Sequence, residues 1–459
     1  MQINLPEKVS HIISVLKAEG YEAYAVGGCV RDCLLGRKPD DWDITTSADP
    51  LSVKRIFKRT VDTGLKHGTV TVLMGKESYE VTTYRIDGVY EDGRHPREVT
   101  FTDRLEEDLM RRDFTINALA YNDDTGIVDC FGGLSDLKNG VIRAVNDPEK
   151  RFDEDALRIM RAVRFSAQLD FKIEEKTLSS IIKKADTLRQ ISAERIQTEL
   201  VKLLVSDSPQ KILSLYETGI SRVIMPEIDR MMETEQNNPH HMYNVGIHTV
   251  ETLNNSREWN DRLSRADKRI LRLSLLCHDM GKPDCKSTDE KGTDHFYGHA
   301  GVSEEIASRI LKRLKFDNDT IYKVRTLVKY HDHRDVLTKP KLRRLMAKIG
   351  DDLMPLWFIL RRCDTNAQSE YKRREKLECI DSCEKLYREI VRDKDCLTLK
   401  DLKVDGKDLI TCGFKPGRQL GAALNRMLQI VLDDPGKNTR EYLLSGELIK
   451  ELYRETENK

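Results

Sequence analysis

The 459-residue chain lacks the features that mark several specialised protein classes. It has no apolar run near the ~18 residues of a membrane-spanning helix, and its start has no basic region followed by an apolar one. Its composition also excludes a collagenous or disordered chain. We therefore expect a cytoplasmic, multidomain globular protein without a membrane partner, and nothing in the sequence implies a protein partner.

Net charge and paired cysteines are absent as well. Lys plus Arg and Asp plus Glu each total 77, so any nucleic acid must be held by locally concentrated charge. The ten cysteines are scattered and include no Cys-x-x-Cys motif. The sequence therefore indicates neither a zinc ribbon nor a disulfide framework, and we expect reduced thiols.

Strand signals gather in the first 150 residues. A short apolar segment, 23–26, runs into a Gly-Gly pair, and two β-branched segments, 70–74 and 79–85, flank a turn at Gly75-Lys76 and predict a hairpin. The segment 86–96, rich in glycine and charge, is typical of a mobile loop. After Asp153 the apolar period becomes that of helices. The predicted fold class is α+β, with a small mixed or antiparallel sheet at the front and an all-helical remainder.

A glycine pair and two acidic residues suggest phosphate and metal chemistry near the N-terminus. Gly28 opens a predicted helix that also carries Arg31, so free backbone amides and a guanidinium can meet an anion, although a purely structural glycine turn is about as common. Asp41 and Asp43 are two apart, so on an extended strand their carboxylates share a face. The alternative is a solvated turn after Pro39.

Glu80 is the candidate for a third carboxylate. It alternates with Tyr79, Val81 and Thr83, which places it on the opposite face of its strand together with Thr82 and Tyr84. Mg²⁺ takes oxygen ligands and leaves positions for substrate phosphates, so these acidic groups suit a magnesium site.

Two further segments offer groups for a nucleotide. Arg112 has the fork of donors that suits phosphate, while Asp113 and Asn117 have the polarity to hold ribose hydroxyls; the alternative is a charged surface turn before a core helix. In a predicted helix over 154–164, Asp155 and Arg158 are i,i+3 neighbours. The alternative there is an ordinary salt bridge on a solvated face.

The pair Asp155 and Arg158 presents a hydrogen-bond acceptor beside a donor. The pairing edges of cytosine and adenine both show an amine beside a bare ring nitrogen, whereas guanine and uracil show the reverse, which would leave buried polar groups unpaired. Helical rotation keeps Arg161 near this pair but carries Arg164 to the far side, where we expect a phosphate or an acidic neighbour.

Five motifs occur in order: GGCVRD, DDWDI, YEVTTYR, RRDFTINALAYN and EDALRIMRAVRF. Together they resemble the bacterial class II tRNA nucleotidyltransferases, which are the CCA-adding enzymes and their poly(A) polymerase relatives. The resemblance implies that Asp41 and Asp43 bind Mg²⁺ in a two-ion site completed by Glu80. It further implies a base-reading role for Asp155 and Arg158, and nucleotide contacts for a set comprising Gly28, Arg31, Arg112, Asp113, Asn117, Arg161 and Arg164.

The same resemblance implies a domain order. We expect a nucleotidyltransferase head at 1–140, a helical neck for base recognition and RNA binding at 141–225, a helical body resembling an HD domain at 226–375, and a tRNA-binding tail at 376–459. The tail carries GFKPGRQLG, which is similar to a tail motif of the family.

The predicted function is template-independent addition and repair of the 3′-terminal CCA of tRNA from CTP and ATP, with release of pyrophosphate. The intact segment DGVYEDGRHP favours the complete activity, since enzymes of the family restricted to C addition lack a functional loop there. The alternatives are a poly(A) polymerase or A-adding enzyme on the same scaffold, or an HD phosphohydrolase with an RNA-binding front domain.

A second set of residues resembles the metal ligands of an HD domain, the phosphohydrolase fold. The set comprises His248, His278, Asp279 and Asp364, and His299 and His331 extend it. Imidazoles with carboxylates suit a transition metal such as Mn²⁺, Ni²⁺ or Zn²⁺. The alternative is that these histidines are buried or capped structural groups.

Overall fold

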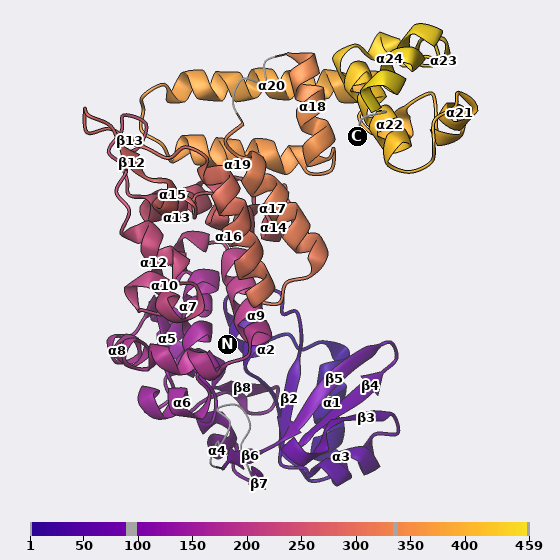
Figure 1. The fold of residues 1–459 in the computed structure, drawn as a ribbon. Helices are drawn as coiled ribbons and strands as arrows, with labels where there is room; N and C mark the ends of the chain where they lie inside the picture. Colours follow the sequence, from indigo (N-terminus) through magenta and orange to yellow (C-terminus); the bar gives the residue numbers. More distant parts are fainter. Residues whose placement is uncertain (1, 89–98, 334–337, 457–459) are drawn as a thin grey trace. The chain divides into compact units, whose positions relative to one another are not determined.

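The computed structural model describes residues 2–88, 99–333 and 338–456. Most of the predicted mobile loop, 89–98, lies outside the described residues. The chain divides into two compact units, 1–229 and 230–459 (Figure 1). The finer division into head, neck, body and tail stays a prediction.

A seven-stranded sheet organises the first unit. Its order is β3-β4-β5-β2-β1-β8-β9, and β2 and β5 run parallel while the other neighbours are antiparallel. The predicted mixed sheet is therefore confirmed, together with the strand over 23–26. The strands are β1 (Ala23–Val26), β2 (Asp43–Thr46), β3 (Thr60–Gly64), β4 (Thr69–Met74), β5 (Glu77–Thr83), β8 (Leu119–Asn122) and β9 (Gly126–Asp129).

Three short strand pairs lie outside this sheet. They are β6 (Arg85–Asp87) with β7 (Val99–Phe101), β10 (Val141–Ile142) with β11 (Lys172–Ile173), and β12 (Ser287–Thr288) with β13 (Asp294–His295). The last two pairs interrupt the region predicted to be entirely helical.

The hairpin of β4 and β5 forms as the sequence predicts. Gly75 takes a positive φ of 70° in the turn, which its missing Cβ permits. Along β5, Tyr79 and Val81 are buried and Glu80 is exposed, so the predicted alternation is confirmed. Tyr84 was expected on the face of Glu80, but it is fully buried because the strand ends at Thr83 and the alternation ends with it.

Helices form most of the remaining regular structure of the first unit, and one prediction about them is wrong. Instead of one helix over 154–164, α6 ends at Glu154 and α7 begins at Leu157. Asp155 between them is extended (φ −146°, ψ 103°), and its Oδ1 accepts a hydrogen bond of 3.0 Å from the backbone N–H of Leu157. A short polar side chain that bonds the backbone in this way favours a helix boundary over a helix interior.

The helices of the first unit are α1 (Glu7–Ala18), α2 (Gly28–Leu34), α3 (Pro50–Ile56), α4 (Leu105–Met110), α5 (Gly133–Asn139), α6 (Pro148–Glu154), α7 (Leu157–Leu169), α8 (Glu175–Lys184), α9 (Ala193–Leu204), α10 (Leu213–Glu217) and α11 (Ser221–Ile224), followed by α12 (Glu227–Met232), which spans the boundary. The start of α2 at Gly28 is where the glycine pair predicts it.

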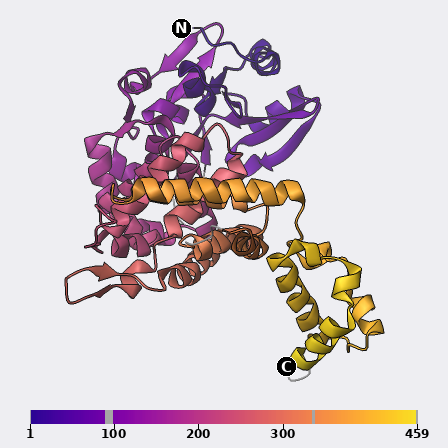
Figure 2. The ribbon, with the colours of Figure 1, turned by 90° about the horizontal axis from the view of Figure 1, so that it is seen from above.

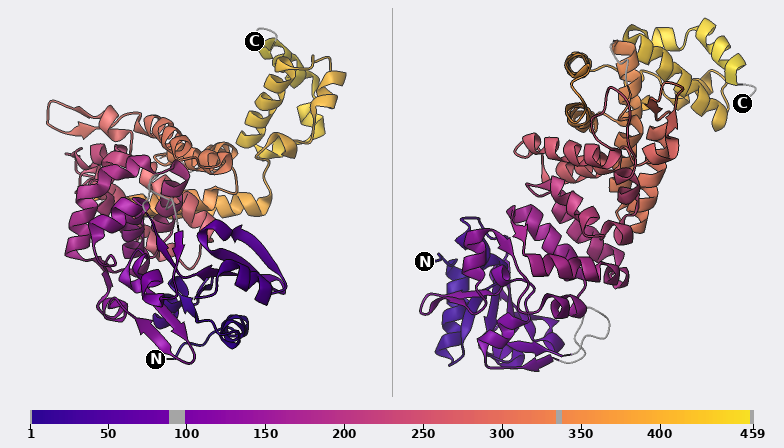
Figure 3. Two further views of the ribbon diagram at one scale, coloured as in Figure 1. Left: turned by 90° about the horizontal axis from the view of Figure 1, so that it is seen from below. Right: turned by 90° about the vertical axis from the view of Figure 1, so that its left-hand side faces the viewer.

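In residues 230–333 and 338–456, the regular structure of the second unit is helical apart from the β12–β13 pair. Its helices are α13 (Val245–Asn255), α14 (Arg265–Cys277), α15 (Lys282–Cys285), α16 (His299–Arg313), α17 (Asn318–Tyr330), α18 (Lys339–Ile349), α19 (Met354–Asn366), α20 (Arg373–Asp393), α21 (Gly406–Thr411), α22 (Arg418–Asp433), α23 (Arg440–Leu443) and α24 (Gly446–Thr456). Figure 2 shows α20 as a single long orange helix, and Figure 3 shows both units from two further sides. None of the helices in the described residues has both the length and the apolar character that crossing a membrane requires.

Candidate active site

Three carboxylates meet at one cavity of the first unit. Asp43 and Glu80 are directly paired in the parallel register of β2 and β5, and Asp41 lies two residues before Asp43. All three line a cavity of about 860 Å³. The structure therefore brings together the acidic residues that the sequence singles out.

The electrostatics of this cavity favour a cation. Desolvation raises the pKa of Asp43; Arg112 opposes this shift, while Asp41 and Glu80 raise the pKa further. A carboxylate whose charge is disfavoured by two acidic neighbours gains when a divalent ion binds among them. Oxygen donors on adjacent strands, open to a cavity, fit Mg²⁺ and leave room for a triphosphate.

Gly27, which was not among the predicted site residues, leaves room for the guanidinium of Arg112. Gly27 has a positive φ of 84°, and a Cβ at this position would lie 2.5 Å from Nη1 of Arg112. At Gly28 the nearest atom would be Nη2 of Arg31 at 3.8 Å, an ordinary contact. The tight requirement for glycine therefore falls on the first residue of the pair. The signal in the sequence is the pair itself, which does not tell which glycine is constrained.

A polar network connects the start of α2 to α7. Arg31 Nη1 donates to Asn117 Oδ1 (2.6 Å), Asn117 Nδ2 donates to Asp113 Oδ1 (3.0 Å), and Arg161 Nε donates to Asp113 Oδ2 (2.6 Å). Burial alone would raise the pKa of Asp113, but Arg161 and Asn117 outweigh burial and hold this pKa well below its usual range. Four of the predicted nucleotide residues thus form one connected group.

Asp155 and Arg158 lie near one another, but their side chains have other partners. Arg195 Nη2 donates to Asp155 Oδ2 (2.7 Å), and Arg158 donates to Glu154 (2.7 Å) and to the carbonyl oxygen of Arg111 (2.9 Å). Their base-reading role stays a prediction. Arg195, on α9, was missed because nothing in the sequence relates it to a residue 40 positions earlier.

Arg164 has the acidic neighbour expected for it. Its Nε donates to Glu199 Oε2 (2.8 Å), and its Nη1 donates to Gln168 Oε1 (2.9 Å). Both Arg164 and Glu199 are buried, and burial lowers the pKa of Arg164 to about 10. Rotation within α7 separates Arg164 from Arg158 and Arg161, but Asp155 precedes this helix, so the rotation argument does not extend to it.

Comparisons with known proteins agree with this geometry. Three family descriptions match consecutive regions: "Poly A polymerase head domain" over residues 23–143, "Probable RNA and SrmB- binding site of polymerase A" over 170–232, and "tRNA nucleotidyltransferase domain 2 putative" over 288–446. The CCA-adding enzyme of Levilactobacillus brevis is 35% identical over 450 residues, which cover 96% of this chain and 98% of that protein. The chain belongs to the CCA-adding enzyme family.

Other CCA-adding enzymes are more alike over a shorter stretch. That of Lactobacillus helveticus is 54% identical over 209 residues, which cover 46% of this chain and 52% of that protein. Among solved structures, the Bacillus stearothermophilus CCA-adding enzyme in complex with CTP is 31% identical, covers 98% of both chains and has a TM-score of 0.71.

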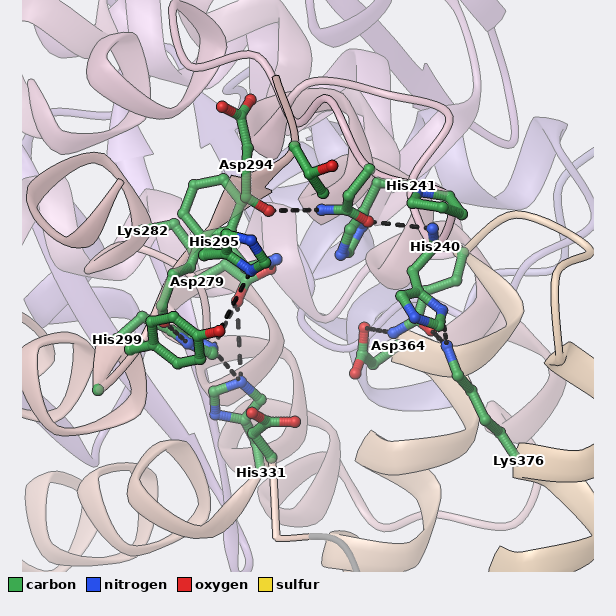
Figure 4. A pocket seen from close by; sticks show the side chains of 18 residues that line it. His240, His241, Asp279, Lys282, Asp294, His295, His299, His331, Asp364 and Lys376 are labelled. Carbon is green, nitrogen blue, oxygen red and sulfur yellow. Dashed lines mark hydrogen bonds and ion pairs between the residues drawn. The ribbon is translucent and has the colours of Figure 1, made fainter. Parts of the chain in front are cut away.

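This member of the CCA-adding enzyme family also has a buried cluster of imidazoles around Asp279 in its second unit. Asp279 Oδ2 lies 3.2 Å from His278 Nε2 and 3.6 Å from His248 Nε2. Asp279 Oδ1 lies 3.4 Å from His299 Nε2 and 3.7 Å from His331 Nε2. One carboxylate therefore joins two groups of potential metal ligands, as Figure 4 shows for His299 and His331.

The four imidazoles all contact the backbone through the same ring nitrogen. In each ring Nδ1 faces a backbone carbonyl oxygen: Leu275 for His278 (2.7 Å), Phe296 for His299 (2.8 Å), Val328 for His331 (2.6 Å) and Ala367 for His248 (3.3 Å). A neutral ring held in this way carries its proton on Nδ1 and presents the Nε2 lone pair, which is the arrangement found in metal-bound histidines.

The positions of the ring nitrogens and carboxylates in this cluster suit a bound cation. His299 Nε2 and His331 Nε2 lie 3.2 Å apart, so two lone pairs face each other unless a positive charge lies near them. Burial lowers the pKa of His331 to about 4, so this ring is neutral at neutral pH. Asp364 adds a carboxylate 3.0 Å from His248 Nε2. All six ligands suggested by the sequence are thus brought together.

Lys282 was not predicted to take part. Its Nζ lies 2.7 Å from Asp279 Oδ2, and it also donates to Gln236 Oε1 (2.7 Å). The signal was available, because Lys282 follows Asp279 by three residues at the start of α15. This ammonium compensates part of the negative charge of Asp279.

Proposed function

We propose that this chain adds and repairs the 3′-terminal CCA of tRNA from CTP and ATP without a template, with release of pyrophosphate. The observation that carries the proposal is the meeting of Asp41, Asp43 and Glu80 in one cavity. The similarity to CCA-adding enzymes over nearly the whole chain supports it. We also propose that the chain acts in the cytoplasm, as expected from the sequence.

In the proposed mechanism, Asp41 and Asp43 hold Mg²⁺ and Glu80 completes a two-ion site. Bound magnesium supplies activation of the attacking 3′-hydroxyl and neutralisation of the triphosphate. Arg112, held beside Gly27, provides donors for the phosphates. Asp113 and Asn117, already fixed by the network with Arg161, hold the ribose hydroxyls.

Base selection is proposed to rest on Asp155 and Arg158. Arg195 engages one oxygen of Asp155, which fixes the direction of this carboxylate. The acceptor of Asp155 and the donors of Arg158 then complement the pairing edges of cytosine and adenine. Guanine and uracil would leave both groups unpaired, at a cost of about 1–3 kcal/mol for each group.

Incorporation assays on defined tRNAs test this function. With transcripts that end before, within and after CCA, we expect C addition from CTP, then A addition from ATP, and no product from GTP or UTP. A complete CCA end should receive nothing further. Long A tails on any RNA would instead identify a poly(A) polymerase, and A addition without C addition would identify an A-adding enzyme.

A second activity is favoured by the cluster around Asp279. We propose that His248, His278 and Asp364 on one side of Asp279, and His299 and His331 on the other, hold transition metal ions such as Mn²⁺, Ni²⁺ or Zn²⁺ for phosphoester hydrolysis. The shared carboxylate and the uniform presentation of Nε2 atoms support this proposal. Bound metal would supply a water of lowered pKa as the nucleophile.

Metal binding by the Asp279→Asn variant tests the second site. The comparison is made in an Asp43→Ala background, which removes the proposed metal site of the first unit. We expect the chain that is wild type at position 279 to bind Mn²⁺ at this cluster, and Asp279→Asn to lower that affinity at least about 10-fold, because the ligand shared by both groups loses its charge. Isothermal titration calorimetry measures the Mn²⁺ affinity of each chain. Asp284→Asn is the matched control, since Asp284 pairs with Arg230 outside the cluster. Equal Mn²⁺ binding with and without Asp279→Asn would contradict the site.

A further inference from the structure

The cluster around Asp279 opens into a cavity that has an aromatic wall. The cavity has a volume of about 520 Å³, within the usual size range of small-molecule sites. His295 and Tyr297 line it, and their rings are stacked with centroids 5.3 Å apart and planes 7° apart. Tyr297 is 78% exposed, so the ring face turned away from His295 is open. This open ring face, beside a buried polar cluster, is a surface on which a flat ligand can stack.

The stacked pair is held in place by the loop between β12 and β13. His295 Nε2 lies 3.0 Å from Asp289 Oδ2, and the other oxygen of Asp289 accepts hydrogen bonds from the backbone N–H groups of Lys291 and Thr293 (2.9 Å each). The Tyr297 hydroxyl and His295 Nδ1 lie at hydrogen-bond distance (3.3 Å). The two rings are therefore oriented before any ligand binds.

The same segment is anchored to the body of the second unit. Asp294 is buried, and it accepts hydrogen bonds from the backbone N–H of Asn237 (2.8 Å) and the hydroxyl of Thr288 (2.7 Å). These bonds and Lys286 outweigh the effect of burial and lower the pKa of Asp294 to about 2, so it stays ionised. The base of the hairpin is thus a fixed part of the cavity.

A short stretch of chain connects the stacked pair to the ligand cluster. Phe296, between His295 and Tyr297, accepts the hydrogen bond from His299 Nδ1 (2.8 Å) through its carbonyl oxygen. Its ring lies 5.4 Å from Lys282 Nζ. The residues that present the aromatic wall therefore also orient His299 toward Asp279.

Positive charge lies on the other side of the cavity. Lys376 on α20 donates to His240 Nδ1 (3.1 Å) and to Gln368 Oε1, and Gln368 Nε2 donates to Asp364 Oδ1 (3.1 Å). Figure 4 shows Lys376 reaching toward His240 and Asp364. Lys282 adds an ammonium 2.7 Å from Asp279 Oδ2, so an anionic group at the cluster would lie near a positive charge. A flat group in the same cavity can face Tyr297.

We infer that the His295–Tyr297 pair is a stacking platform for a nucleobase, and that this cavity takes a nucleoside phosphate whose phosphate group lies at the Asp279 cluster. The inference rests on the proposed metal site for the position of the phosphate. The platform itself rests on the ring geometry and its anchoring. Tyr297 is then the residue that selects a nucleotide over a phosphate ester without a base.

Calorimetric titration in Mn²⁺ tests the platform with AMP and with ribose 5-phosphate, which has a hydroxyl group in place of the base. All variants are made in the full-length Asp43→Ala chain, so that the proposed nucleotide site of the first unit no longer holds a metal ion. Tyr297→Ala should weaken AMP binding about 10-fold and leave ribose 5-phosphate unchanged, since stacking on an aromatic side chain contributes this much per base. Tyr297→Phe should keep the AMP affinity. Tyr322→Ala is the matched control, because Tyr322 is an exposed tyrosine of the same unit on α17, outside the cavity lining.

The outcomes separate this inference from the proposed metal site. Unchanged AMP affinity in Tyr297→Ala, or equal losses for AMP and ribose 5-phosphate, would overturn the platform. Binding of AMP no tighter than that of ribose 5-phosphate by the Asp43→Ala chain would overturn it as well. Equal Mn²⁺ binding with and without Asp279→Asn refutes the metal site alone, and a selective loss of AMP in Tyr297→Ala would still support the platform.

Discussion

Replacement of Asp43 by alanine should lower nucleotide incorporation by about 10³-fold with Mg²⁺, because the paired carboxylates of β2 and β5 then no longer hold a cation for the triphosphate. Single-turnover addition of C to a tRNA ending before CCA measures the loss. Glu77→Gln is the matched control: Glu77 lines the same cavity, but it accepts hydrogen bonds from Lys8 and Tyr79. Substantial activity in Asp43→Ala would refute the proposed site.

Removal of the charge of Asp43 should keep or raise the free energy of unfolding, although it abolishes the proposed cation site. The fold raises the pKa of Asp43, so at neutral pH its ionised form is less favourable in the folded chain than in the unfolded one, and its charge lowers the free energy of unfolding. Asp43→Asn removes that charge. In the absence of divalent ions we expect an unfolding free energy equal to or above that of the wild type. A clearly destabilised Asp43→Asn variant would contradict this expectation and show that the carboxylate of Asp43 supports the sheet.

Replacement of Glu199 by alanine should reduce the free energy of unfolding by about 3 kcal/mol, which urea denaturation of the full chain measures. The change leaves the buried guanidinium of Arg164 without its anionic partner, and an uncompensated buried charge costs more than the pair contributes. Gln168 remains as a neutral acceptor. Glu199→Gln should be milder, because an amide oxygen can still accept the hydrogen bond.

An exposed ion pair of the same unit serves as the control for Glu199. Lys183 and Glu149 lie 2.7 Å apart at the surface, where water and salt screen their attraction. Glu149→Ala should leave the urea midpoint unchanged. Comparable losses from Glu149→Ala and Glu199→Ala would show that burial of the Arg164 pair does not determine its contribution.

Local patterns predicted the sheet elements of the site. Alternation of buried and exposed residues placed Glu80 on the open face of β5. The spacing of Asp41 and Asp43 predicted only that these two lie together, although β2 begins at Asp43 and Asp41 precedes the strand. That both meet Glu80 was implied by the family resemblance. The parallel pairing of β2 with β5 was not predictable, because the sequence gives no register between strands that are separated by a hairpin. The adjacency of Asp43 and Glu80 is a property of the assembled sheet.

Helical periodicity was less informative around Asp155. The apolar pattern continues through this residue, whereas its side chain bonds the backbone N–H of Leu157 and ends the helix. A similar limit holds for Lys376, which contacts His240 and lines the cavity at the ligand cluster from α20. Nothing local to Lys376 relates it to histidines far earlier in the chain, since that proximity arises from the packing of helices.

The register between β2 and β5 limits which insertions the chain can accept while keeping Asp43 beside Glu80. Side chains alternate across a strand, so a shift by one position would turn Glu80 toward the apolar interior and bring a neighbouring side chain opposite Asp43. If the three carboxylates act together as proposed, an insertion of one amino acid in β5 ahead of Glu80 should abolish incorporation while every acidic group remains in the sequence. Loss of activity in natural or engineered variants thus need not touch any of the three carboxylates.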